Sequence, residues 1–464
     1  MKLVHASILV SLFALTACGG HVGSDDGSGG GGTPGGAKPG DGTADSGVAP
    51  PPADTGTPPV GDTGTPPVED TAPPVDNGAP SDKYPAFKID MPQLTTNGGD
   101  VLKTPVVVSV TFPSEDPTHV TAYESFADTL GKSDYWKQIV SEYGVGPTVS
   151  ATAEHVHNAV DLPSMISDTD IDTWVADHAT NFAKYGWPAP TDQTIYVIYV
   201  PQKTGFTFQG GDVCSSGVGG YHTSTDVGGK QVAYAILPQC DRGGGSIIDE
   251  TTLSSSHEIG EAATDPHPQS TPGYTGVDDN HLAWEFFMQF QAENGDLCEV
   301  YRDSSYKPTS DGDFVSVVQR QWSNVSAAAG HNPCVPVPKG AYFNTVPLGL
   351  EDITIDLSSF GSSSKFKTKG YKILKDETKT VSFGFNSDGP TAAWSIKAYE
   401  GGAFGPAKTS RLTVTIDKAT GQNGEKANVT IKVNSVGKSK SELLTIVSTS
   451  GGAKHFMPIL IGSQ

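Results

Sequence analysis

From Gly19 to about Asp82 the chain consists mainly of Gly, Pro, Thr, Asp and Ser, with almost no large apolar residue. Such a segment cannot bury enough surface to offset the entropy of ordering it, so no fold is expected there. The sequence DTGTPPV begins at Asp54 and again at Asp62, and these acid-flanked proline pairs should keep the chain extended and solvated. We predict a disordered tether over residues 19–83, which leaves the later residues to form the fold.

The first eighteen residues have the layout of a secretory signal. One lysine precedes an apolar run from Ile8 to Leu15, and small residues precede Cys18. The run is too short to span a bilayer. The sequence LTAC resembles the bacterial lipobox, whose cysteine becomes the lipidated first residue of the mature chain. We therefore predict a lipoprotein signal peptide over residues 1–18, with a plain signal peptide as the alternative. A lipid at Cys18 would anchor the chain to a membrane of the bacterial cell envelope, with its folded domains in the periplasm or on the cell surface.

The segment from about Lys83 to Gln464 is long enough for two domains of ordinary size. The formal net charge of the whole chain is −22 at pH 7. Because phosphate binding needs a basic face, this acidic balance argues against nucleic acid as a partner.

Apolar patterns in the first part of this segment indicate both strands and helices. Runs of β-branched residues between turn residues predict buried strands, whereas apolar residues at helical intervals predict helices. Strands are expected over 105–112, 194–200 and 232–237, and helices over 122–143, 171–185 and 247–264. This order is typical of an α/β or α+β domain with a central sheet, which we place at residues 84–338.

The pattern changes after the linker-like sequence VPVP, which ends at Pro338. Short segments there alternate apolar and polar residues, with turn signals between them. They span 381–385, 394–396, 412–416, 429–433 and 443–447. Residues 339–464 are therefore predicted to form an all-β sandwich of the immunoglobulin-like type. We expect a spacer or a carbohydrate- or protein-binding module, with a purely structural role as the alternative.

Four cysteines follow the one in the lipobox, an even number in an exported chain, so two disulfides are expected. We favour Cys214–Cys240 and Cys298–Cys334 among the three possible pairings, because each closes a glycine-rich or loop-like segment. The alternative is a cysteine-ligated metal, but no C-x-x-C spacing occurs among the four.

The helix expected over 247–264 contains the string HEIGE, which differs by one letter from the H-E-x-x-H of zinc peptidases. Residues four apart lie about 5–6 Å apart on one face of a helix, so His257, Glu261 and Asp265 form a row that could hold a metal ion. Glu258 lies further around the helix, where it could take a proton from water as a general base. An ordinary acidic surface helix is the alternative, although the neighbouring small residues would permit close approach of other backbone.

A carboxylate in place of the second imidazole changes which ions suit the site. Zinc accepts carboxylate oxygens, but each negative ligand lowers the net charge at the metal and makes a bound water less acidic. Zinc remains the expected ion, and manganese or calcium would fit almost as well.

Several segments resemble the plant EXORDIUM or phosphate-induced protein family, with its HELAE…NP, EIADLCE and VQ…W-N series. The matching segments are HEIGEAATDP from His257, ENGDLCE from Glu293, VVQ from Val317, WSN from Trp322 and GGYH from Gly219. They are also similar to secreted bacterial proteins with SHEL-AEA-TDP and GDLC. The similarity covers roughly residues 106–334, and it implies an extracellular zincin-like domain with suspected peptidase activity.

The chain departs from the plant pattern at two points. It lacks a cysteine beside Gly220, which leaves the pairing of Cys214 in doubt. It also ends the motif helix with Asp265-Pro266 in place of Asn-Pro, and this aspartate could add a ligand or merely cap the helix.

The resemblance also supplies candidates for a third metal ligand. Asp296 and Glu293 lie in a matching segment, and His222 and His281 are further candidates. A turn-forming role after Gly295 is the alternative for Asp296. His222, in a glycine-rich segment, could instead orient a substrate or stabilise an oxyanion.

These features together predict a surface-anchored lipoprotein with a metal-dependent peptidase-like domain acting on extracellular protein or peptide. The alternative is a non-catalytic binding or adhesion lipoprotein with a structural metal or no metal. A serine or cysteine nucleophile is disfavoured, because no G-x-S-x-G elbow occurs and the cysteines are expected to be paired.

Overall fold

The computed structural model of the protein describes residues 77–146, 154–241, 245–290, 292–356, 365–407 and 409–463. These residues belong to one compact unit. The predicted signal peptide with Cys18, and the predicted tether as far as residue 76, lie outside the described residues. Within the described part of the chain, no helix is long and apolar enough to cross a membrane.

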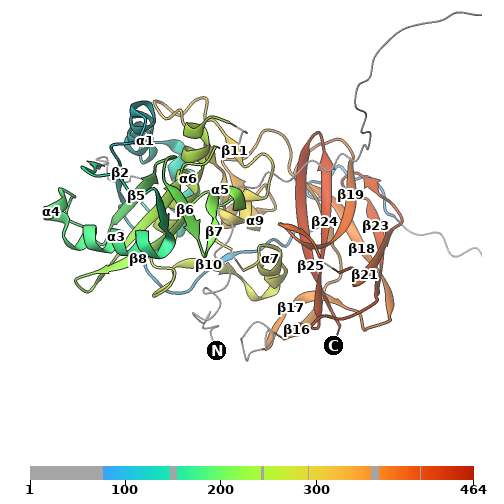
Figure 1. Cartoon of the computed structure of the whole chain (residues 1–464). Helices are drawn as coiled ribbons and strands as arrows, with labels where there is room; N and C mark the ends of the chain where they lie inside the picture. The colour runs from blue at the N-terminus through green and yellow to red at the C-terminus, as the bar shows by residue number, and fades with distance from the viewer. Residues whose placement is uncertain are drawn as a thin grey trace, which may run out of the picture. The chain divides into compact units, whose positions relative to one another are not determined.

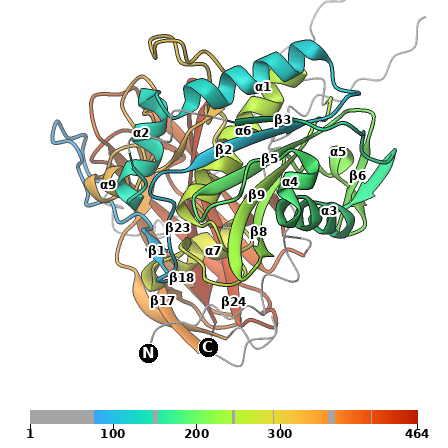
Figure 2. The ribbon, with the colours of Figure 1, turned by 90° about the vertical axis from the view of Figure 1, so that its left-hand side faces the viewer.

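A five-stranded mixed sheet forms the centre of the first region (Figure 2). In sheet order its strands are β3 (Glu154–His157), β2 (Val106–Thr111), β5 (Thr194–Val200), β9 (Lys230–Pro238) and β8 (Tyr221–Val227). The first four run parallel, whereas the edge strand β8 is antiparallel to β9. Every residue of β5 is buried, as expected for an apolar strand covered on both faces. The three strands predicted here are therefore confirmed.

Helices cover both faces of this sheet. Apolar residues of α1, α2 and α6 share one buried cluster with one face, and those of α3 and α5 share another with the opposite face. Figure 2 shows α1 and α3 on opposite sides of the strands. The helices are α1 (Pro117–Leu130), α2 (Asp134–Val140), α3 (Asp168–Thr180), α5 (Val213–Ser216) and α6 (Ile247–Thr264). This region therefore has an α/β arrangement with a central sheet.

Two predicted helices are each divided in the structure, and a serine side chain caps the start of a helix in both regions. The helix predicted over 122–143 is broken after α1, where the Ser133 side chain accepts from the Trp136 N–H and starts α2. The helix predicted over 171–185 begins earlier, at a capping box formed by Ser167 and Asp170, and is interrupted after Thr180.

Helix α6 spans the predicted residues and is not a surface helix. Ser246 caps its first turn, and all residues from Ser254 to Thr264 are buried. The small residues were expected to permit close approach of other backbone, but at Gly260 the neighbour is a side chain, because a Cβ there would lie 2.3 Å from Nε2 of Gln321. The alternative of a solvated acidic helix is therefore wrong.

The second region is a β-sandwich made from two sheets (Figure 1). One sheet contains β15 (Phe343–Pro347), β18 (Thr378–Ser387), β23 (Lys426–Val433) and β21 (Leu412–Ile416). The other contains β16 (Glu351–Asp356), β17 (Lys365–Lys372), β25 (Ala453–Gly462), β24 (Ser441–Ser450), β19 (Trp394–Gly402), β20 (Gly405–Pro406) and β22 (Thr420–Gly421). Phe383 and Ile431 from the first sheet share a buried cluster with Ile446 and Ile459 from the second. The five predicted strands are confirmed, whereas β15, β16, β17 and β25 were not predicted.

The end of the predicted tether belongs to this sandwich, so the predicted boundary at residue 83 is wrong. Lys426 N donates to Asn77 O at 2.6 Å, and Ser81 N donates to Asn423 O at 2.8 Å. These are backbone hydrogen bonds, which a composition of small and polar residues does not reveal. The chain therefore contacts the C-terminal strands before it enters the mixed sheet.

Both predicted disulfides are present, which answers the doubt about Cys214. Cys214 pairs with Cys240, and Cys298 pairs with Cys334. The alternative of a metal held by these cysteines is therefore wrong.

The remaining described elements are short. They are β1 (Leu94–Thr96), β4 (Met165–Ser167), β6 (Gly205–Phe208), β7 (Gly211–Asp212), β10 (Tyr274–Val277), β11 (Ser305–Tyr306), β12 (Val318–Gln319), β13 (Gln321–Trp322), β14 (Cys334–Val335), α4 (Phe182–Tyr185), α7 (Leu282–Phe287), α8 (Asp296–Glu299), α9 (Asn324–Ala329), η1 (Ser141–Tyr143) and η2 (Asp279–His281).

Candidate metal centre

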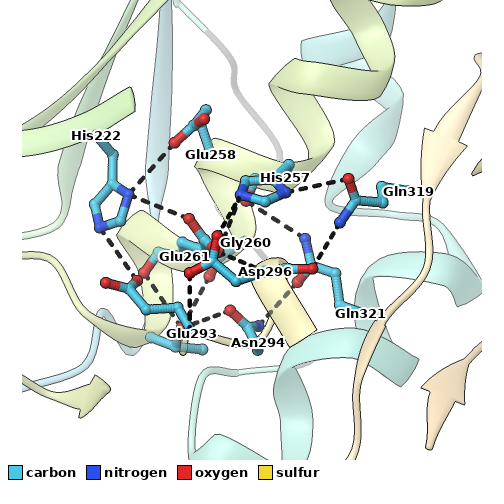
Figure 3. Close-up of polar contacts among 12 residues, drawn as sticks. His222, His257, Glu258, Gly260, Glu261, Glu293, Asn294, Asp296, Gln319 and Gln321 are labelled. Carbon is cyan, nitrogen blue, oxygen red and sulfur yellow. Dashed lines mark hydrogen bonds and ion pairs between the residues drawn. The ribbon is translucent and has the colours of Figure 1, made fainter. Parts of the chain in front are cut away.

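The residues predicted to form a site come from three separate parts of the chain (Figure 3). Helix α6 contributes His257, Glu258 and Glu261, the edge strand β8 contributes His222, and the start of α8 contributes Asp296. The disulfide of Cys298 holds α8 to β14.

Three of the predicted ligands meet in one group. His257 Nε2 lies 3.0 Å from Glu261 Oε1 and 3.7 Å from Asp296 Oδ1. One ligand atom from each residue lies within 4.8 Å of the others, and all three residues are buried. The spacing of four residues on α6 thus places His257 and Glu261 together, as predicted, and α8 brings in the third residue.

Gln319 fixes the orientation of the His257 ring from the opposite side. The Oε1 atom of Gln319 lies 3.1 Å from His257 Nδ1, while its Nε2 donates to Gly295 O at 2.8 Å. Because the amide nitrogen is engaged with a carbonyl, the amide oxygen accepts from an Nδ1–H. The Nε2 atom of His257 faces the two carboxylates, and with a cation bound it would supply the lone pair. Gln319 was not predicted as a site residue, although VVQ was one of the matching segments.

His222 joins a second group that shares Glu261 with the first. Its Nδ1 lies 3.4 Å from Glu258 Oε2 and 3.5 Å from Glu261 Oε2. Its Nε2 lies 3.5 Å from Glu293 Oε2. Both carboxylate oxygens of Glu258 are buried and have no hydrogen-bond donor in the part of the chain that the structure describes. His222 therefore contacts both Glu258, the other residue predicted to be catalytic, and the predicted ligand Glu261.

Two glycines permit the close contacts of this pocket. A Cβ on Gly295 would lie 2.7 Å from Glu261 Oε1 and 2.8 Å from His257 Nδ1. A Cβ on Gly220 would lie 3.0 Å from Glu258 Oε1. Both glycines belong to segments that carried the family resemblance, so a steric reason exists for glycine at these positions.

The electrostatics of the pocket follow from its burial. Burial raises the pKa of Glu258, and burial also raises the pKa of Asp296 well above its ordinary value. For Glu261, burial acts in the same direction, but His257 and His222 outweigh it and lower the pKa to about 2. Burial alone would lower the pKa of His222, yet the surrounding carboxylates hold it well above the ordinary value. The pocket therefore favours bound positive charge.

Two predicted candidates have other contacts. Asp265 ends α6, and its Oδ1 accepts from Gly273 N at 2.7 Å, which anchors the following loop. It belongs to neither group of ligand atoms. His281 lies outside both groups as well, with its Nδ1 2.9 Å from Asp278. Of the two suggested roles for Asp265, the structure thus favours the one at the helix end.

Asp296 and Glu293 form a turn with each other, and both also lie at the site. The Oδ2 atom of Asp296 accepts from Glu293 N at 3.1 Å, which is the turn-forming contact considered from the sequence. The other carboxylate oxygen of Asp296 faces His257. Glu293 contacts His222 but not His257. It therefore lies beside the two groups of ligand atoms and belongs to neither of them.

The residues present fit a divalent cation. Imidazole nitrogens and carboxylate oxygens are ligands for zinc and manganese, and carboxylates also suit calcium. The buried oxygens of Glu258 without a hydrogen-bond donor are of the kind that a cation satisfies. The donor set does not select one of these ions.

Comparison with protein-family models and with curated proteins finds no match. Two titin structures are among the similar solved structures. The trigonal form of titin M4 is 10% identical, covers 20% of this chain and 86% of its own, and has a TM-score of 0.15. A chimeric titin Z1Z2 carrying an exogenous peptide from decorin is 10% identical, covers 25% and 98%, and has a TM-score of 0.14. Scores this low carry no argument about the fold or the function of this chain.

Proposed function

We propose that this protein is a lipid-anchored envelope protein whose zincin-like domain is a metal-dependent hydrolase of peptide bonds in extracellular proteins or peptides. The observation that supports it best is the meeting of His257 and Glu261 from α6 with Asp296 from α8, with Glu258 beside them in the same buried pocket. Three ligands and an adjacent carboxylate base are the parts that such a hydrolase needs.

The arrangement of elements supports the zincin-like assignment. The helix that carries the motif packs on the mixed sheet, next to the antiparallel edge strand that contributes His222. The matching segments around Glu293 and Gly219 also reach this pocket, although they are distant in the sequence. Residues that resemble the family are therefore gathered at one place.

The chemistry assigns separate roles to the residues of the pocket. His257, Glu261 and Asp296 would hold the ion, which when bound supplies Lewis acidity for a substrate carbonyl and makes a water more acidic. Glu258 takes the proton of the attacking water and returns it to the leaving amine. Its burial and raised pKa suit a group that must accept and then release a proton.

Metal content and peptide cleavage, measured together on the full-length protein, test this function. We expect His257→Ala to lose the ion, because one of three protein ligands is removed. We expect Glu258→Gln to keep an ion at the His257 group while cleavage of a denatured protein falls by about 10²–10⁴-fold. His281→Ala, outside both groups, is the matched control and should change neither quantity.

A wild-type protein that binds no ion, or a His257→Ala variant that keeps its full metal content, would contradict the proposal. Either outcome would leave the chain as a binding protein with an acidic buried helix.

The depth of the site favours a second candidate, a non-catalytic binding or adhesion lipoprotein with a structural ion. The side chains of His257, Glu258 and Glu261 are 0%, 1% and 4% exposed, so a substrate has little direct access to them. For a structural ion, removal with EDTA should lower the melting temperature, and the metal-loaded protein should show no cleavage. Cleavage that returns when the ion is restored would exclude this candidate.

A further inference from the structure

We propose that the pocket binds a second divalent cation, held by His222 Nδ1, Glu258 Oε2 and Glu261 Oε2. The Glu261 carboxylate then bridges this cation and the one assigned to His257 and Asp296. This inference rests on the proposed function, which places the first cation. With Glu258 Oε2 on the second cation, Glu258 Oε1 is the oxygen left for the role of base. Figure 3 shows His222 and His257 on either side of Glu261.

The distances around His222 are those of shared ligation and not of hydrogen bonds. Its Nδ1 lies 3.4 Å from Glu258 Oε2 and 3.5 Å from Glu261 Oε2. An N–H···O hydrogen bond is shorter, at about 2.7–3.2 Å. Two ligand atoms that are each about 2.0–2.1 Å from a tetrahedral zinc ion lie about 3.3 Å apart. In the first group, His257 Nε2 lies 3.0 Å from Glu261 Oε1 and 3.7 Å from Asp296 Oδ1, so one distance is shorter and the other longer than this ligand–ligand separation.

The Glu261 carboxylate is oriented as a bridge. Its Oε1 faces His257 and also accepts from Asp296 N at 3.1 Å, which fixes the plane of the group. Its Oε2 faces His222 from the other end. Paired ions in hydrolytic two-metal sites lie about 3.5–4 Å apart, a separation that one bridging carboxylate can span.

Each histidine has an oxygen on the side away from its proposed ion. Gln319 Oε1 lies 3.1 Å from His257 Nδ1, within hydrogen-bond distance, whereas Glu293 Oε2 lies 3.5 Å from His222 Nε2 and forms no hydrogen bond with it. Metal-binding histidines usually donate their second N–H to an acceptor, which orients the ring and selects the tautomer. Within the described residues, His257 has such a partner in hydrogen-bond range, and Glu293 is the nearest candidate for His222.

The charge of the pocket also favours two cations. Four buried or nearly buried carboxylates lie together, and the ion pairs described for them are with the two histidines of the pocket. They are Glu258, Glu261, Glu293 and Asp296. If all four were ionised, one divalent cation would offset half of their negative charge, whereas two would offset all of it. Buried charge that is not compensated destabilises the fold.

Zinc stoichiometry measured on the full-length protein tests the second site. After zinc loading and removal of excess zinc, elemental analysis should give two ions per chain for the wild type. His222→Ala should give one, because it removes a ligand of the second cation only, and Glu258→Gln should weaken the second site by replacing its carboxylate with a neutral amide, so that one ion remains after excess zinc is removed. His281→Ala should give two. Glu258→Gln preserves the shape of the side chain, so it keeps the test valid if His222→Ala does not fold.

The outcomes separate this inference from the proposed function. One zinc ion in the wild type, retained by His222→Ala, overturns the second site and leaves the first one intact. No zinc in the wild type overturns both. Loading with Mn²⁺ gives an independent measurement, since two bridged ions should produce an exchange-coupled electron paramagnetic resonance spectrum. A spectrum of isolated Mn²⁺ alone would overturn the bridge.

Discussion

Gln319 is the residue through which the His257 ring is held, so its side chain should affect metal affinity without touching the metal. Gln319→Ala removes the acceptor for His257 Nδ1 and leaves the backbone contact from Gln319 N to Ser256 Oγ in place. We expect zinc affinity, measured by competition with a chelator, to fall by about 10–100-fold. Gln138→Ala, on the exposed face of α2, should leave the affinity unchanged. Equal affinity in both variants would show that Gln319 has no positioning role.

Gly295 should tolerate no side chain, because a Cβ there would overlap both Glu261 and His257. We expect Gly295→Ala to displace these groups, to abolish stoichiometric metal binding and to destabilise the protein by about 1–3 kcal/mol. Gly211→Ala is the control, since its Cβ would meet only Phe208 O at 3.6 Å. Metal content and urea unfolding of the two variants provide the comparison. A Gly295→Ala protein with full metal content would contradict the geometry of the pocket.

The sequence could indicate only some of the residues at the site. His257 and Glu261 follow from helical spacing alone, since both belong to one helix. Asp296 required the family resemblance, because no local pattern connects α8 to α6. Gln319 carries no charge and acts through a contact 62 residues away, so only its place in the matching VVQ segment could have marked it as functional.

Among the elements, prediction succeeded where the local pattern was strong and failed where tertiary contacts decide. Strand β5 and helix α6 have the predicted bounds, because each has a long apolar pattern with clear limits. The break between α1 and α2 depends on a single serine cap within an otherwise helical pattern. Strands β16 and β17 contain many lysines and acids and pair with each other at the sheet edge, and the alternation in β16 is limited to Ile353 and Ile355, which is too short a pattern to mark a strand by itself.

Helix α7 carries a buried carboxylate outside the candidate site, and this should make stability depend on pH. Burial raises the pKa of Glu285 to about 7, although the hydrogen bond from Val277 N acts in the opposite direction. The folded state therefore holds this proton more tightly than the unfolded state. The stabilisation that this tighter proton binding gives the folded state is fully present below about pH 4.5, the ordinary pKa of the group. It is lost as the pH rises towards 7, the pKa in the folded state.

The Glu285→Gln variant should lack that dependence, because an amide keeps the acceptor for Val277 N without an ionisable proton. Relative to the wild type we expect it to gain up to about 3 kcal/mol of unfolding free energy between pH 4.5 and 8. Urea unfolding at a series of pH values measures the difference. Parallel pH profiles for the two proteins would show that the carboxylate does not titrate as expected.

At the scale of the whole molecule, the corrected boundary of the predicted tether sets where the folded part begins. Residues 77–87 hydrogen bond to the sandwich through Asn77 O, Ser81 N and Phe87 N, the last of which donates to Asn386 Oδ1 at 2.8 Å. The Phe87 ring also fills the space beside Gly384, where a Cβ would lie 2.5 Å from it. This segment is therefore expected to be part of the stable fold, in contrast to the composition-based prediction for residues 19–76.

Limited proteolysis and two truncated chains test this division. Proteases should cut within residues 19–76, where the composition predicts no core, and should leave a product that begins near Asn77. A chain starting at Asn77 should melt at the temperature of the full-length protein. A chain starting at Lys88 loses the hydrogen bonds of Asn77, Ser81 and Phe87 and the packing of the Phe87 ring, so we expect it to melt several degrees lower, at about 2–4 °C per kcal/mol. Equal melting temperatures for the two truncated chains would show that residues 77–87 contribute nothing to the fold, and resistance to proteolysis across residues 19–76 would contradict the tether itself.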